Sequence, residues 1–183
     1  NEGVVRQIRW SPRSFLRSDI LSDRERQAII EYGRSKIDIR IPIRSNLTNS
    51  KAVELETETE ELKRLQKIIS EWVMIPQSHG ENFILRRFSP GDAYDLHFDF
   101  FENEKETGPS GQRASTFVYI LEAPAIGGDF EFPRAKLFVP PVAGDALLYH
   151  NRLPNAQPDL MSLHGENRVI EGEKWTLTKY FRE

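Results

Sequence analysis

The stretch Tyr94-Asp95-Leu96-His97-Phe98-Asp99 places a histidine and a carboxylate two positions apart. Side chains two positions apart in a β-strand point to the same face, so His97 and Asp99 are expected to reach one metal ion together. His164, far along the chain, is a third candidate ligand that could return on a neighbouring strand. Two histidines and one carboxylate form the facial triad that leaves coordination positions open on Fe(II). The sequence therefore predicts an iron site at His97, Asp99 and His164.

A lysine near the end of the chain, Lys174, follows Gly172 and precedes an apolar stretch that begins at Trp175. Lysines are rarely buried without an anion, so an inward-facing Lys174 needs a negatively charged partner. The far carboxylate of an oxo-diacid bound to the iron would meet that need. Because strand side chains alternate, Thr176 shares the face of Lys174, whereas Trp175 points the other way. The Thr176 hydroxyl is therefore expected to contact the same carboxylate.

Further motifs accompany these residues in a fixed order. A His-x-Asp motif alone occurs by chance, but here a Gly-Gly turn, a Pro-x-x-Gly turn and a His-x9-Lys ending follow it. This order resembles the prolyl 4-hydroxylase family of iron and 2-oxoglutarate dependent dioxygenases, with matching residues from 81 to 181. Besides the stretch quoted above, the matching pieces are Gly80-Glu81-Asn82, Arg113-Ala-Ser-Thr116, Gly127-Gly128-Asp-Phe-Glu-Phe132-Pro133, Pro141-Val-Ala-Gly144-Asp-Ala-Leu147 and the segment from His164 to Trp175.

The resemblance implies both a fold and an activity. The implied fold is α+β and mainly β, with a double-stranded β-helix (jelly-roll) core and N-terminal helices packed on one sheet. The implied enzyme uses Fe(II), 2-oxoglutarate and O2, with ascorbate as a candidate reductant. It would hydroxylate prolyl residues in a peptide or protein and release succinate and CO2.

The resemblance also implies which residues meet the substrate. Tyr94 and Arg113 match positions that contact the peptide in the family, and Tyr180 stands where the family usually has tryptophan. Phe88 and Phe130 replace a usual tyrosine and a usual threonine. Two alternatives to prolyl hydroxylation therefore remain open. One is the same chemistry on another side chain or a free amino acid, and the other is a non-catalytic jelly roll that binds a metal or ligand.

Length and composition are compatible with this interpretation. A chain of 183 residues with 38% hydrophobic residues is expected to form one domain, with residues 1–75 as support and 80–183 as the jelly-roll core. A formal net charge of −3 argues against a nucleic-acid partner, and no apolar run is long enough to span a membrane. The absence of cysteine excludes disulfides and thiol catalysis. A soluble domain follows, in the cytoplasm or the secretory-pathway lumen, with its oligomeric state open.

Two segments have the signatures of helices. Residues 21–33 begin with Ser22 followed by Glu25 in a capping-box pattern, and Gly33 is expected to end this helix. Residues 57–73 carry an apolar stripe opposite their charges, with Thr57 as the expected N-cap. This second helix is expected to support the sheet and not to bind a partner.

The remaining pattern predicts strands and two lids. Polar loops at residues 44–50 and 102–112 are expected to flank the mouth of the site and to order when a ligand binds. His79 lies in a turn and is not expected to bind metal, whereas His150 could face the pocket from its strand. Strands are predicted at residues 4–10, 37–43, 82–88, 95–101, 116–121, 137–139, 146–150 and 174–181.

Overall fold

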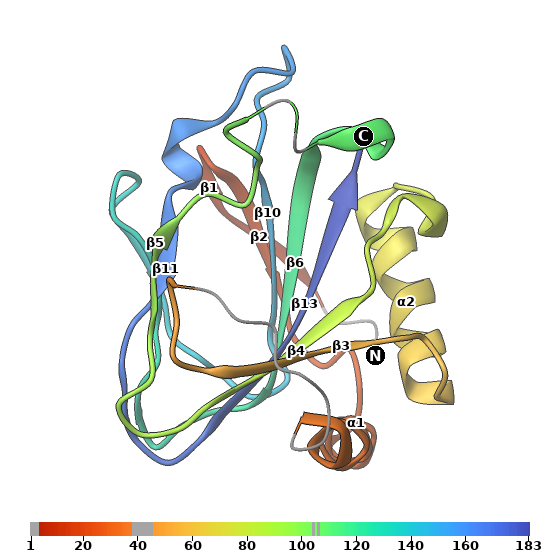
Figure 1. Ribbon diagram of the computed structural model, residues 1–183, viewed down its shortest axis with the longest axis vertical. Helices are drawn as coiled ribbons and strands as arrows, with labels where there is room; N and C mark the ends of the chain where they lie inside the picture. Colours follow the sequence, from red (N-terminus) through yellow and green to blue (C-terminus); the bar gives the residue numbers. More distant parts are fainter. Residues whose placement is uncertain (1–3, 38–45, 104, 106) are drawn as a thin grey trace.

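The computed structural model describes residues 4–37, 46–103, 105 and 107–183. A larger and a smaller antiparallel sheet face each other, and two helices cover the outer face of the larger sheet (Figure 1). This arrangement confirms the predicted jelly roll with helices packed on one sheet. Within the described residues, no helix is long and apolar enough to cross a membrane.

The strands follow the predicted pattern with several additions. The predicted strands near residues 4–10, 82–88, 116–121, 137–139, 146–150 and 174–181 are confirmed. The larger sheet runs through β1 (Val5–Trp10), β2 (Arg13–Arg17), β10 (Ala146–His150), β6 (Arg113–Glu122), β13 (Lys174–Arg182), β4 (Phe83–Phe88) and β3 (Lys51–Leu55). The smaller sheet runs through β5 (Tyr94–His97), β11 (His164–Glu166), β8 (Phe130–Phe132) and β9 (Leu137–Val139), and a separate pair joins β7 (Ile126–Gly127) to β12 (Val169–Glu171).

Helix α1 (Asp23–Ile37) begins as predicted but ends later. The Ser22 amide donates to Glu25 Oε2 at 2.8 Å, which confirms the capping box. Gly33 does not end the helix, because its role is packing: a Cβ there would lie 1.9 Å from Cδ2 of Leu85. The predicted strand at 37–43 is therefore wrong at Ile37, and residues 38–43 lie outside the described part of the chain.

Helix α2 (Glu60–Val73) starts two residues later than a Thr57 cap would require. Its N-cap is Thr59, whose Oγ1 accepts a hydrogen bond from the Leu62 amide at 3.3 Å. Thr57 instead donates its hydroxyl to Gln66 Oε1 at 2.7 Å. The helix buries the stripe Leu62, Leu65 and Ile69.

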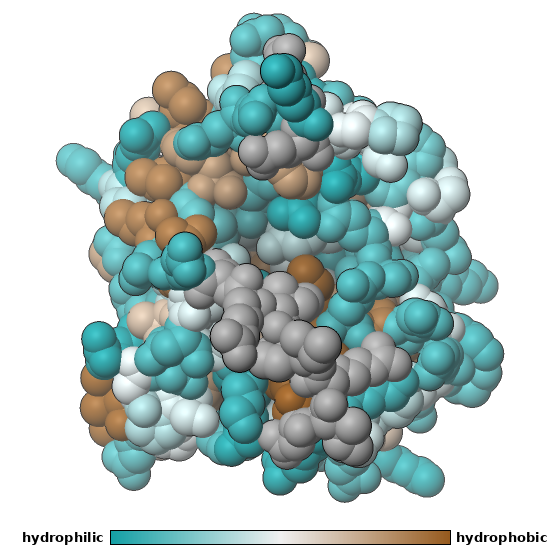
Figure 2. All heavy atoms as spheres, in the orientation of Figure 1, coloured by the Kyte–Doolittle hydropathy of each residue, from teal (hydrophilic) through white to brown (hydrophobic). Residues whose placement is uncertain are grey.

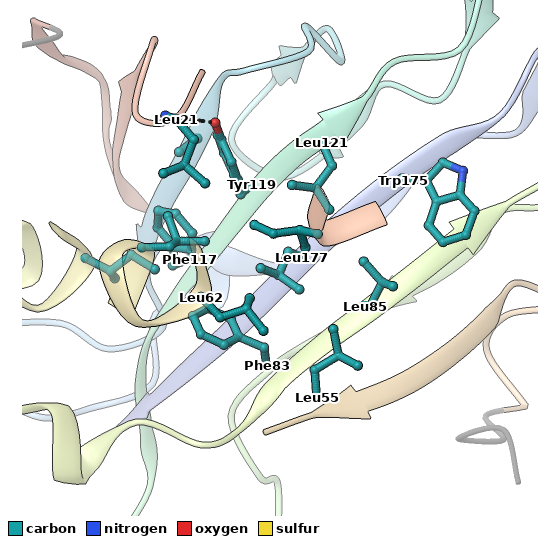
Figure 3. Packing of buried hydrophobic residues seen from close by; sticks show 14 of the residues in the cluster. Leu21, Leu55, Leu62, Phe83, Leu85, Phe117, Tyr119, Leu121, Trp175 and Leu177 are labelled. Carbon is teal, nitrogen blue, oxygen red and sulfur yellow. Dashed lines mark hydrogen bonds between the residues drawn. The ribbon is translucent and has the colours of Figure 1, made fainter. Parts of the chain in front are cut away.

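The main hydrophobic core lies between the helices and the outer face of the larger sheet. Trp175, Leu177 and Phe181 of β13 are fully buried on this face. Figure 3 shows side chains from β4, β6 and β13 gathered there, with Leu62 of α2 among them. The opposite face of the same strands points toward the smaller sheet, and the polar side chains of the site stand on that face.

The first part of the chain contributes to the same sheet as the later part. Strand β3 pairs with β4, and β2 pairs with β10, so strands of the first part flank those of the later part at both edges of the larger sheet. The division into support at 1–75 and core at 80–183 stays a prediction.

Candidate metal centre

The three predicted ligands converge between the two sheets. His97 ends β5, His164 opens β11, and the two residues are direct partners in the pairing of these strands. One ligand atom from each of His97, Asp99 and His164 lies within 4.8 Å of the other two. Nε2 of His97 is 3.5 Å from Asp99 Oδ1, and Nε2 of His164 is 3.6 Å from Asp99 Oδ2. The structure therefore brings all three together at one point.

Asp99 reaches this point by another route than the sequence predicted. The expected strand at 95–101 ends at His97, so strand alternation does not place Asp99. Instead, two residues of the larger sheet hold its carboxylate: Thr116 Oγ1 donates to Oδ2 at 2.7 Å and the Tyr149 hydroxyl at 2.6 Å. Neither residue was predicted from the sequence to belong to the site. Both side chains point inward from β6 and β10. That they lie close to Asp99 could be inferred only from the order of the strands in the sheet.

Both histidines present the same ring nitrogen to the centre. Nδ1 of His97 lies 2.7 Å from the Asp95 carbonyl oxygen, and Nδ1 of His164 lies 2.9 Å from the Ser162 carbonyl oxygen. A carbonyl can only accept, so each Nδ1 carries a proton, and in the neutral form of each ring the lone pair is on Nε2. This tautomer is the one a metal ligand needs. The Tyr149 hydroxyl, which donates to Asp99, also lies 2.9 Å from Nε2 of His164.

The charges at the centre are strongly coupled. Burial would raise the pKa of Asp99, but the neighbouring His164 and His97 outweigh it and hold the pKa far below its usual value. Burial would lower the pKa of His97, but its contacts with Asp99 outweigh burial and raise the pKa. Burial lowers the pKa of His164 and prevails over the attraction of Asp99. The centre thus holds an ionised carboxylate beside two imidazoles, a donor set suited to a divalent cation.

Lys174 lies inside the barrel, where its side chain is 0% exposed. Its Nζ donates to the Gly128 carbonyl at 2.6 Å and lies 2.6 Å from Glu166 Oε2, an ion pair that was not predicted from the sequence. Gly127 is required at the adjacent turn, because its φ is +86° and a Cβ there would lie 2.3 Å from the Arg168 carbonyl. The predicted inward direction of Lys174 is confirmed, and its anion in this structure is a side chain of the protein.

Two further buried polar groups lie on the face of Lys174. Thr176 shares that face as predicted, and its Oγ1 has no hydrogen-bond partner. Arg86 stands directly opposite Thr176 in the pairing of β4 with β13 and is 4% exposed, with Nη1 unpartnered. The signal for Arg86 was present in the sequence: in Arg86-Arg87, alternation forces one of two adjacent arginines inward.

The predicted substrate residues lie around this centre. The Tyr94 ring stacks on His97 with centroids 4.1 Å apart. Arg113 makes two hydrogen bonds to Glu81, at 2.8 and 2.7 Å, and its guanidinium lies 3.6 Å from the Tyr180 ring centre. Tyr180 is buried beneath it at 5% exposure.

The two other histidines stand apart from the centre. His150 hydrogen-bonds Ser115 and Arg13, so it does not face the metal centre. Within the described residues, the only His/Asp/Glu group that could hold a metal ion includes neither His150 nor His79.

A cleft of about 580 Å³ opens in front of the triad. It is continuous with His97 and Asp99 and includes Arg113. Its other walls are mainly apolar and aromatic, from Leu47, Leu96, Phe98, Phe100, Phe101 and Leu163. Such a lining suits an extended ligand with apolar parts.

Known proteins share both the sequence and the fold. Residues 83–182 match the model of the 2OG-Fe(II) oxygenase superfamily. Probable prolyl 4-hydroxylase 9 of Arabidopsis thaliana is 33% identical, over 96% of this chain and 70% of the relative. Probable prolyl 4-hydroxylase 7 of the same plant is 30% identical, over 96% of this chain and 64% of the relative. The chain thus spans about two thirds of the length of these relatives.

The fold matches a solved structure of similar size. The viral collagen prolyl hydroxylase of Paramecium Bursaria Chlorella virus-1, in complex with 2OG, has a TM-score of 0.78 with this chain at 24% identity. The match covers 92% of this chain and 95% of the viral one. The family matches confirm the resemblance seen in the motifs. The chain belongs to the prolyl 4-hydroxylase family of the 2OG-Fe(II) oxygenase superfamily, whose members are dioxygenases that use Fe(II), 2-oxoglutarate and O2.

Proposed function

We propose that His97, Asp99 and His164 bind Fe(II) and that the chain hydroxylates prolyl residues in a peptide or protein. 2-Oxoglutarate and O2 are consumed, and succinate and CO2 are released. One observation carries the proposal: three ligand atoms of the required types converge within 4.8 Å beside a cleft. The lone pairs on both Nε2 atoms and the ionised carboxylate fit the preferences of a facial-triad iron.

Lys174 and Thr176 are proposed to bind 2-oxoglutarate. The unpartnered Thr176 Oγ1 and the buried Lys174 ammonium lie on one face, which fits a ligand that carries a carboxylate. When bound, iron and 2-oxoglutarate would activate O2, which is the oxidant, and the protein's own part is positioning and exclusion of water. Phe88 and Phe130 contribute to that exclusion, since both rings are buried and flank the Lys174 ammonium.

The cleft is proposed to hold a peptide or protein segment. Figure 2 shows a mostly hydrophilic face with hydrophobic side chains gathered near β5 and the segment before β11. Leu96, Leu160 and Met161 are exposed in these segments. Arg113 lines the cleft, whereas Tyr180 is buried under Arg113 and is proposed to act by holding that guanidinium in place. Relatives named prolyl 4-hydroxylases and a neighbour named a collagen prolyl hydroxylase support a prolyl-containing polypeptide as substrate.

The proposal is tested by incubating the Fe(II)-loaded protein with 2-oxoglutarate and a panel of substrates. The panel contains proline-rich peptides, matched peptides with alanine in place of proline, and free amino acids. We expect succinate release and a mass increase of one oxygen only with the proline peptides.

Other outcomes would assign another function. Oxygen incorporation into the alanine-matched peptides or a free amino acid would move the activity to another substrate. Absence of succinate with every substrate, from protein that carries stoichiometric iron, would overturn the enzymatic proposal.

A further inference from the structure

We infer that Arg86 supplies the uncompensated cation that binds the distal carboxylate of 2-oxoglutarate, because Lys174 is already neutralised by Glu166. The inference rests on the proposed function and adds a specificity-determining residue to it. It assigns to Arg86 a ligand of defined chemistry, a carboxylate separated from the keto acid by two methylene groups.

Arg86 is aimed into the site. Directly opposite residues of an antiparallel pair project to the same face, and Arg86 lies opposite Thr176. Its guanidinium lies 4.6 Å from the centre of the Tyr94 ring, and that ring stacks on His97 at 4.1 Å. Arg86 thus stands between the Lys174 face of the larger sheet and a residue of the metal centre.

No carboxylate in the described part of the chain compensates this guanidinium. Nη1 has no hydrogen-bond partner, and Nη2 makes one long contact, 3.5 Å, to the Tyr94 hydroxyl. The other arginines near the site differ: Arg113 and Arg182 both form ion pairs with Glu81. An isolated buried cation is costly, so Arg86 is expected to meet an anion when the site is occupied.

Lys174 is the less available cation of the two. Glu166 is 5% exposed, and its Oε2 lies 2.6 Å from the Lys174 ammonium. Cosubstrate binding at Lys174 must compete with this carboxylate. A divalent ion bound at Asp99 and the Lys174 ammonium are both partly neutralised by carboxylates of the protein. Without Arg86, the positive charge that remains is smaller than the negative charge of the two carboxylates of 2-oxoglutarate.

The chemistry of the side chain fits the assignment. A guanidinium offers parallel N–H donors in a fixed plane and binds carboxylates through two hydrogen bonds. The free Nη1 of Arg86 and the free Oγ1 of Thr176 belong to opposite residues, so one carboxylate could accept from both. Removal of Arg86 should therefore weaken binding of the distal carboxylate specifically.

The test measures binding and not turnover. Titration calorimetry on Zn(II)-substituted protein compares 2-oxoglutarate with 2-oxovalerate, which keeps the keto acid and lacks the distal carboxylate. For Arg86→Met we expect the Kd of 2-oxoglutarate to rise at least about tenfold and that of 2-oxovalerate to stay unchanged. The matched control is Arg87→Met, whose guanidinium lies on the other face of β4 and hydrogen-bonds Glu173 at 3.0 Å. This control should leave both constants unchanged.

A second variant sharpens the result. Glu166→Gln releases the Lys174 ammonium, so we expect tighter 2-oxoglutarate binding and a smaller loss when Arg86→Met is added. Unchanged 2-oxoglutarate binding in Arg86→Met, or equal weakening of both ligands, would overturn the inference and leave the proposed function standing. Failure of the unmodified protein to bind 2-oxoglutarate at all would overturn the proposed function, and the inference with it.

Discussion

The two faces of β13 differ in almost every physical respect although their residues alternate along one strand. On the outer face, Trp175, Leu177 and Phe181 pack into the helix-covered core. On the inner face, Lys174 and Thr176 are equally buried but polar, and they face the smaller sheet. On the neighbouring β4, Phe83 and Leu85 pack into the same core, whereas Arg86 projects to the inner face. Burial is the same on both faces, so it does not distinguish core from site.

One strand thus contributes both to the hydrophobic core and to the site. Because side chains alternate along a strand, neighbouring residues point in turn to the core and to the site. A substitution therefore changes either stability or cosubstrate binding, depending on the face that its side chain occupies. The outer face follows the usual rules of hydrophobic packing. The inner face keeps unpartnered polar atoms, which a purely structural interior would avoid.

The largest effect is expected at the metal centre. His164→Ala and Asp99→Ala should each abolish bound iron and lower turnover by at least about a thousandfold, because each removes one ligand of three. The proteins should remain folded, since the outer core is untouched. Iron stoichiometry, turnover and thermal unfolding of each purified variant check this prediction. A His164→Ala protein with full iron content would contradict the assignment of the triad.

Lys174→Met should lower both the stability and the cosubstrate affinity, although Lys174 lies on the inner face. It leaves Glu166 buried without its cation, which should cost about 3 to 5 kcal/mol of unfolding free energy. It should also raise the 2-oxoglutarate Michaelis constant by at least about tenfold, with iron content unchanged. Adding Glu166→Gln should restore much of the stability but not the Michaelis constant. Denaturant unfolding and steady-state kinetics on both proteins give the two readouts, and equal recovery of both would refute the separation.

Substitutions at the adjacent positions 176 and 177 should change cosubstrate binding and stability separately. Leu177→Ala removes a fully buried outer side chain and should lower the unfolding free energy by about 2 to 5 kcal/mol, with the 2-oxoglutarate Kd unchanged. Thr176→Val replaces an unpartnered hydroxyl by a methyl group and should leave stability within about 0.5 kcal/mol while weakening 2-oxoglutarate binding. Chemical denaturation and calorimetry test the pair. Loss of cosubstrate affinity in Leu177→Ala would show that the two faces are coupled.

The smallest effect concerns His150, outside the metal centre. Burial and the neighbouring Arg13 lower the pKa of His150 to about 4, from 6.5 when unperturbed. Between pH 6.5 and 4, His150 is therefore protonated in the unfolded chain but neutral in the folded protein. The free energy of unfolding falls as the pH drops through this range. This loss is at most about 1.4 kcal/mol per pH unit. His150→Gln should show a shallower decline in denaturant titrations, and parallel curves for the two proteins would argue against it.

Motif order predicted much of the molecule. The jelly roll and the helix-covered sheet were implied by the family resemblance, and the inward Lys174 was predicted from strand alternation. The convergence of His97, Asp99 and His164 was predicted from residue type, although Asp99 is placed by bonds from Thr116 and Tyr149.

What the sequence left out depends on contacts between distant strands. The pairing of Glu166 with Lys174 requires the turn at Gly128 and the approach of β11, which no local pattern encodes. The end of α1 was misplaced because Gly33 serves a close approach to Leu85, a packing role that a sequence pattern cannot tell from a helix stop. Local patterns thus predicted the residue types of the site, but not the contacts between residues that are distant in the sequence.

The orientation of the two histidines has a consequence for how the centre tolerates change over evolution. Each Nδ1 donates to the backbone carbonyl of the residue two positions earlier, Asp95 for His97 and Ser162 for His164. A backbone acceptor is present whatever side chain stands there, so drift at positions 95 and 162 need not turn either imidazole. The direction in which the two Nε2 atoms point is thereby set by the backbone and does not depend on neighbouring side chains.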